Sequence, residues 1–237
     1  MKKLLNNPIT ILVINITLSI ALCIINIFYQ LPAPNWNLTF KFIGSGIFVL
    51  LGAINLTYAL INKNTNSRFS ITLFVGMLLS FSGDVAIEYE FIAGAALFAL
   101  AHVCYIVAFY FINKFHWLDI VISVGFAIPA ALSIGLLDFF VFNPPILKYV
   151  VIIYALIISF MFGKSISCLI LKRNFQSVIS FIGAFLFVVS DFCLLIELFS
   201  TLEYVVRIDF GHACMAIYFP ALLVFGYSIY YQNKKIL

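Results

Sequence analysis

The chain has 237 residues, of which 65% are hydrophobic and only 9% are charged. A water-soluble globule of this length exposes more surface than 13 basic and 9 acidic residues can cover, so the composition excludes an ordinary soluble fold. In a bilayer the outer surface must itself be apolar, and this composition is then expected. The net charge of +4 does not indicate nucleic-acid binding, because the basic residues form small clusters between apolar stretches.

Apolar stretches of membrane-spanning length recur along the whole chain. A helix needs about 20 apolar residues to cross the hydrocarbon core of a bilayer. The sequence predicts an all-α membrane protein with one eight-span domain over residues 1–237, and any active site is expected inside the bundle or at its mouths. The predicted spans are 8–29, 39–61, 69–88, 91–112, 117–138, 147–171, 175–198 and 206–231.

The distribution of charge predicts the orientation of these spans. Lysine and arginine gather at both termini and in the second, fourth and sixth loops. The odd-numbered loops hold acidic residues instead, namely Glu88, Glu90, Asp138 and Glu203. Because basic residues are retained on the cytoplasmic side, both termini are expected in the cytoplasm. The expected location is the bacterial cytoplasmic (inner) membrane.

Rare charged residues recur at matching positions in the two halves of the chain. Asp84 and Asp191 are 107 positions apart, and so are Lys41 and Lys148. Apolar sequences match easily by chance, so these charged residues are the better indication of an internal repeat. The pattern predicts a parallel duplication of four plus four spans, with half-repeats of about 1–115 and 116–237.

Asp84 and Asp191 lie inside predicted spans, about one and two helical turns from their outer ends. An ionised carboxylate in hydrocarbon is costly, so each must face the bundle, a partner or a water-filled pocket. One interpretation is a pair of carboxylates that line a common pocket. The alternative is that Lys41 and Lys148, whose helices begin on the same side, merely neutralise them.

Two nearby carboxylates in a partly dry site do not both ionise easily, so one can serve as an acid and the other as a base. This arrangement suits acid-catalysed hydrolysis of an ether, acetal or enol ether. It equally suits proton-coupled transport, and the residues alone leave both open.

Other polar residues near these spans are candidates for the same pocket. His102 and His212 could pair with the aspartates or bind a metal, but no HxxxH or HExxH spacing favours a metal site. Ser82 and Ser190 are expected to form hydrogen bonds, since no GxSxG elbow is present. The remaining candidates are Lys41, Glu88 and Tyr105. Glu88 lies one turn after Asp84, and Tyr105 lies three residues after His102, so each shares a helix face with the residue before it.

Two groups of motifs resemble a known family. Ser82-Gly83-Asp84, followed by Phe91-x-x-Gly94 and His102-x-x-Tyr105, resembles the first signature of the YhhN-type lysoplasmalogenase family. Its second signature is similar to Gly183-x-x-x-Phe187-x-x-Ser190-Asp191, and Tyr154-Ala155-Leu156 with Met161 is similar to its sixth-span pattern. The likeness covers most of the chain.

The resemblance implies an ether hydrolase that cleaves the vinyl ether bond of lysoplasmalogen, releasing a fatty aldehyde and a glycerophospho-base. The two essential aspartates of the family correspond to Asp84 and Asp191, and the implied reaction requires no cofactor. The expected partners are the lysophospholipid substrate and membrane lipids, with the substrate entering laterally between helices. The competing hypothesis is a proton- or ion-coupled transporter that uses the same carboxylates.

Overall fold

The structure is a computed structural model that describes residues 7–31, 37–62 and 66–231. These residues form eight α-helices and, apart from an isolated bridge between Phe140 and Ser200, no β-structure. The helices are α2 (Pro8–Gln30), α3 (Asn37–Ile61), α4 (Ser67–Ala86), α5 (Phe91–Ile112), α6 (Trp117–Leu136), α7 (Ile146–Lys172), α8 (Phe175–Phe199) and α9 (Tyr204–Tyr231).

The eight predicted spans are confirmed, and each helix is long and apolar enough to cross a membrane. Helix ends differ from the predicted ends by no more than two residues. The helices α4 and α6 end two residues early, at Ala86 and Leu136, whereas α9 begins two residues early at Tyr204. The intruding charges Arg207 and Asp209 therefore lie within the first two turns of α9.

Polar residues in the short loops cap the helices that follow them. The side chains of Asn66 and Asn174 accept hydrogen bonds from backbone N–H groups at the starts of α4 and α8. Glu90 caps α5 in the same way, and His116 forms a capping box with Asp119 at the start of α6. These caps satisfy N–H groups that have no partner within the helix, so the residues that interrupt the apolar runs also begin the next helices.

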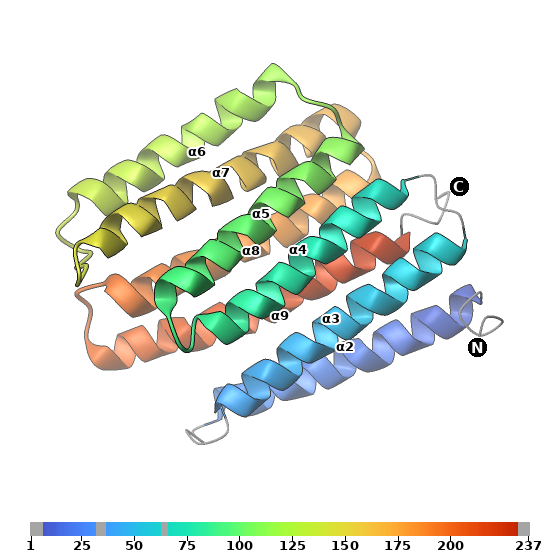
Figure 1. The fold of residues 1–237 in the computed structure, drawn as a ribbon, viewed down its shortest axis with the longest axis horizontal. Helices are drawn as coiled ribbons and strands as arrows, with labels where there is room; N and C mark the ends of the chain where they lie inside the picture. The colour runs from blue at the N-terminus through green and yellow to red at the C-terminus, as the bar shows by residue number, and fades with distance from the viewer. Residues whose placement is uncertain (1–6, 32–36, 63–65, 232–237) are drawn as a thin grey trace.

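The helices run along a common direction, with the start of α2 and the end of α9 at the same end of the bundle (Figure 1). The helices α3, α4, α5, α7, α8 and α9 surround the core, while α2 packs on α3 and α9 at one edge. At the opposite edge α6 packs on α7, and in the described part of the chain no other helix makes comparable contact with it. The bundle therefore has a peripheral helix at each edge.

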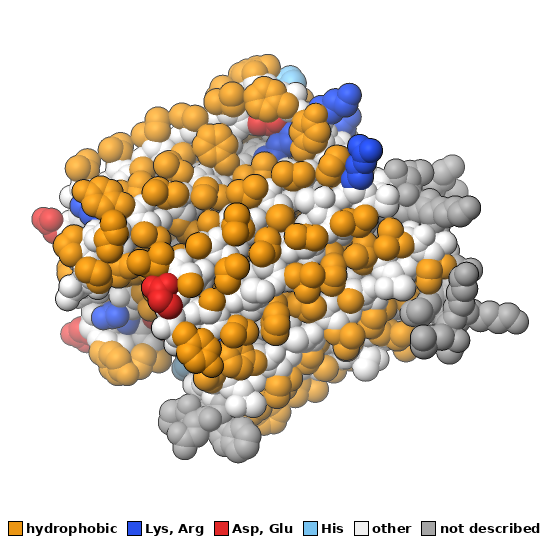
Figure 2. Space-filling model, in the orientation of Figure 1, with side chains coloured by type: hydrophobic (Ala, Val, Ile, Leu, Met, Phe, Trp, Pro, Cys, Tyr) orange, Lys and Arg blue, Asp and Glu red, His pale blue; other side chains and the backbone are white. Residues whose placement is uncertain are grey.

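The surface and the core are both apolar. Figure 2 shows hydrophobic side chains over the length of the visible face, with charged side chains gathered towards its two ends. Aromatic rings fill the centre of the bundle, where Tyr105, Phe187 and Phe225 are fully buried and in mutual ring contact. An apolar belt between charged ends is the surface that a bilayer requires.

Candidate functional site

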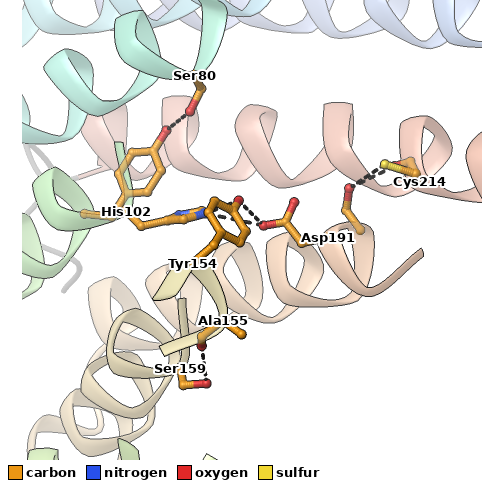
Figure 3. Close-up of polar contacts among 9 residues, drawn as sticks. Ser80, His102, Tyr154, Ala155, Ser159, Asp191 and Cys214 are labelled. Atoms are coloured by element: carbon orange, nitrogen blue, oxygen red, sulfur yellow. Dashed lines mark hydrogen bonds and ion pairs between the residues drawn. The ribbon is translucent and has the colours of Figure 1, made fainter. Parts of the chain in front are cut away.

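Asp191 is held by one helix from each half of the chain. The Tyr154 hydroxyl of α7 donates a hydrogen bond of 2.5 Å to Asp191 Oδ2, and His102 Nε2 of α5 lies 3.3 Å from the same oxygen. His102 Nε2 is also 2.8 Å from the Tyr154 hydroxyl. Figure 3 shows both side chains pointing at one oxygen of the carboxylate. No hydrogen-bond partner of Oδ1 is found among the described residues, so this oxygen is available to a ligand.

The position of His102 indicates which ring nitrogen carries the proton. Its side chain is fully buried, and Nδ1 has no hydrogen-bond partner in the part of the chain that the structure describes. Nε2 faces Oδ2 of Asp191, which accepts a hydrogen bond both when the carboxyl group is ionised and when its proton is on Oδ1. An imidazole with a proton on Nε2 fits this arrangement, because it donates to the Asp191–Tyr154 pair.

Two apolar cavities meet at Asp191. The first, the α5 cavity, has about 430 Å³ of empty space, part of it open to the surroundings, and is lined by residues that include Ile87, Phe91 and Phe98. The second, the α6 groove, has about 910 Å³ of empty space between α6, α7 and α8, part of it open to the surroundings. Tyr154 and Asp191 line both cavities, so a hydrogen-bonded carboxyl group lies at the junction of two apolar spaces.

Asp84 is held in a second, more enclosed cluster. Ser45 of α3 donates a hydrogen bond of 2.6 Å to Asp84 Oδ2, and the Tyr218 hydroxyl of α9 donates one of 2.9 Å. The side chain of Asp84 is buried, and it lines neither the α5 cavity nor the α6 groove. Asp84 thus resembles Asp191 in its hydrogen bonding but differs in its access to these two cavities.

Aromatic rings connect the two clusters. The ring of Tyr218, which binds Asp84, packs edge-on against Phe187 at 5.4 Å between centroids. Phe187 in turn packs against His102, the partner of Asp191, at 4.8 Å. No hydrogen bond joins the two carboxylates. The prediction that both line one pocket therefore stays a prediction for Asp84.

Lys41 and Lys148 have partners other than the aspartates. Lys41 forms an ion pair of 2.5 Å with Glu88 at the end of the bundle, and Lys148 donates a hydrogen bond of 2.6 Å to the carbonyl of Gly135. Neither lysine forms an ion pair with Asp84 or Asp191. The two aspartates are held instead by hydroxyl and imidazole groups.

The other predicted pocket residues lie in different surroundings. Tyr105 pairs with Ser80 at 2.9 Å, and its ring lies 6.0 Å from that of His102. Ser82 is exposed and donates to the carbonyl of Leu78 in its own helix. The last two have partners from other helices: Ser190 donates to the carbonyl of Cys214, and the ring of His212 packs edge-on against Tyr29. Of the predicted residues, the structure brings His102 into direct contact with an aspartate.

Sequence reasoning missed three hydrogen-bond donors to the aspartates. Tyr154 was visible as part of the sixth-span motif, but nothing in that motif indicates its partner. Ser45 and Tyr218 carry no local signal, because they lie 39 and 134 positions from Asp84. Among the described residues no group of three His, Cys, Asp or Glu side chains has the geometry of a metal site.

Comparison with known proteins identifies the family of this chain. No curated protein and no solved structure matches the chain. The sequence model of the YhhN family matches residues 36–229, which include both aspartates and every residue that holds them. The chain belongs to the YhhN family.

Proposed function

We propose that this protein hydrolyses the vinyl ether bond of lysoplasmalogen, releasing a fatty aldehyde and a glycerophospho-base. In this proposal the protonated carboxyl group of Asp191 is the acid. Asp84 is the second carboxylate, whose negative charge stabilises the cationic intermediate.

The reaction needs one proton donor and one water molecule. The acid transfers its proton to the β-carbon of the vinyl ether, and the α-carbon and its oxygen become an oxocarbenium ion. Water adds to the α-carbon and returns a proton to the carboxylate, which gives a hemiacetal. The hemiacetal then breaks its carbon–oxygen bond to the glycerol oxygen, which takes up the hydroxyl proton. An aldehyde and an alcohol result, and the acid is regenerated.

The observation that carries the proposal is the free oxygen of Asp191 at the junction of two apolar cavities. Tyr154 and His102 occupy Oδ2, which leaves Oδ1 to carry the transferred proton towards the cavities. Apolar walls suit a substrate with a hydrocarbon chain, and they raise the strength of any electrostatic stabilisation of the cation.

The decisive experiment is an aldehyde-release assay with purified protein and lysoplasmalogen. Asp191→Asn keeps the size of the side chain but removes the acid, so we expect aldehyde release to fall by at least about a hundredfold. Asp84→Asn is also expected to lower it. Glu203→Gln is the matched control, because Glu203 is an exposed acidic residue that lines neither described cavity.

Two results would contradict the proposal. One is wild-type protein that releases no aldehyde, and the other is equal release by Asp191→Asn. pH-dependent solute uptake into proteoliposomes without any hydrolysis would point to the transporter instead.

A further inference from the structure

We infer that the α6 groove binds one hydrocarbon chain of a single-chain amphiphile. The chain points from the end of the bundle where α7 begins, beside Lys148, towards the middle of the bundle. This inference deepens the proposed function and rests on it for the identity of the reacting bond. The binding itself is a separate property that can be measured without any hydrolysis.

The walls of the groove are suited to hydrocarbon. Its lining is mostly aliphatic and aromatic, with Pro129, Ala130, Ile158 and Val188 along its length. Ser159 also lines it, but the Ser159 hydroxyl donates a hydrogen bond of 2.7 Å to a carbonyl of its own helix. Ser133 of α6 lines the groove as well, so the polar groups left to act on a ligand are the Ser133 hydroxyl and the groups around Asp191.

The length of the groove along the helices matches the thickness of the hydrocarbon region of one bilayer leaflet. On α7 the lining runs from Val151 to Phe162, which at a rise of about 1.5 Å per residue is about 16 Å. Half of a hydrocarbon core is about 15 Å thick. On α8 the lining stops at Val188, near the midpoint of that helix. A chain of ordinary lipid length therefore fits along the helices without crossing the bundle.

Aromatic rings close the inner end of the groove. Phe126 of α6 packs edge-on against Phe162 of α7 at 5.0 Å between ring centroids. Beyond this pair the two helices are in tight contact, because a Cβ atom at Gly163 would overlap Ser123. A buried ion pair of 2.7 Å between Asp119 and Lys164 joins the same ends of the helices. The helices α6 and α7 are thus in close contact from Phe126 and Phe162 to the start of α6, and the groove lies between Phe126 and the end of α6.

The outer end of the groove carries the charge. Lys148 is one turn before Val151 on α7, and its ammonium group lies at the end of α6, on the carbonyl of Gly135. A cationic group at the mouth and aromatic rings at the inner end favour an amphiphile with its chain inward and an anionic head group outward. Phe126 and Phe192 line the groove and are 45% and 56% exposed, so it is also open towards the lipid side.

A comparison with the opposite edge of the bundle explains why the α6 groove is open. There the peripheral helix α2 packs on both α3 and α9. Its counterpart α6 packs on α7 and makes no comparable contact with α5 in the described part of the chain. The space beside Asp191 exists because α6 stands away from the bundle.

The test measures chain-length preference for binding, using a series of saturated lysophosphatidylcholines that displace a fluorescent lysolipid. These probes have an ester in place of the vinyl ether, and the protein is studied in phospholipid nanodiscs because a detergent chain would compete. Affinity is expected to rise with chain length up to a limit and then level off. Ala130→Phe narrows the groove and should weaken binding of the longest chains about tenfold, the equivalent of about two buried methylene groups.

A second variant and a control complete the experiment. Phe126→Ala opens the inner end and should raise the chain-length limit, whereas Val121→Phe on the exposed face of α6 should leave it unchanged, since Val121 lines neither cavity. A limit that neither Ala130→Phe nor Phe126→Ala shifts would overturn the inference. Shifted limits in a protein that hydrolyses no vinyl ether would support it while the proposed function fails. Hydrolysis of the vinyl ether together with unshifted chain-length limits would support the proposed function and overturn the inference about the groove.

Discussion

At the scale of single residues, the buried Asp84 and the half-buried Asp191 are held in the same way. Each uses Oδ2 to accept from a tyrosine hydroxyl and from one further group, Ser45 for Asp84 and His102 for Asp191. Fixed donors reduce the cost of a carboxyl group in an apolar bundle and orient its second oxygen. The difference between the two aspartates lies in the cavities beside Asp191 and not in their hydrogen bonds.

Tyr154→Phe tests whether this orientation matters for activity. The change removes the hydroxyl donor to Asp191 and keeps the ring. In the proposed reaction Asp191 becomes negatively charged as it gives up its proton. A hydrogen bond to a charged group contributes about 1.5 to 3 kcal/mol, so kcat for aldehyde release should fall about tenfold to a hundredfold. Tyr105→Phe is the control, because its hydroxyl pairs with Ser80 and not with an aspartate. An equal loss in both variants would show that the effect is on packing.

At the scale of elements, α6 packs closely on α7 alone among the described helices. It is joined to α7 at its N-terminal half, where Asp119 accepts hydrogen bonds from Lys164 at 2.7 Å and from the backbone of His116 at 2.9 Å. Neither Asp119 nor Lys164 is predicted from the sequence as a buried charge, since one lies in a capping position and the other in a long apolar helix. Buried charges of opposite sign are costly to separate, so this pair fixes the register of α6 against α7.

Lys164→Met is expected to destabilise the protein by about 3 kcal/mol, because it leaves the Asp119 carboxylate buried without its cationic partner. The double variant Asp119→Leu with Lys164→Met should recover most of the loss, since no unpaired charge remains. Thermal unfolding in detergent measures both. Lys148→Met, at a half-buried lysine bound to a carbonyl, should have a smaller effect. A double variant no more stable than Lys164→Met alone would argue against a charge effect.

At the scale of the whole molecule, the packing of the second half follows that of the first. The helix α3 packs on α4 as α7 packs on α8, and α4 packs on α5 as α8 packs on α9. Between the halves, α3 contacts α9 as α7 contacts α5. A parallel duplication requires this exchange of partners, so the packing supports the predicted repeat, which stays a prediction.

The orientation in the membrane can be tested by cysteine labelling of whole cells. If both termini are cytoplasmic, a membrane-impermeant maleimide should label Glu203→Cys in intact cells but Lys172→Cys only after permeabilisation. Both residues are exposed, and they lie at opposite ends of the bundle. The experiment uses a Cys23→Ala background, because Cys23 is an exposed free cysteine. The reverse labelling pattern would invert the predicted topology.

The sequence by itself determined the eight spans and the two acids that lie within them. The thickness of the bilayer requires apolar runs of a given length, and a charge inside such a run is unusual wherever it points. The tertiary structure decided which groups hold the acids and which acid meets a cavity. Tyr218 reaches Asp84 across 134 positions, and the groove beside Asp191 depends on the distance of α6 from α8. Contacts between helices depend on how whole apolar faces pack, and one side chain's position along the chain carries no record of them.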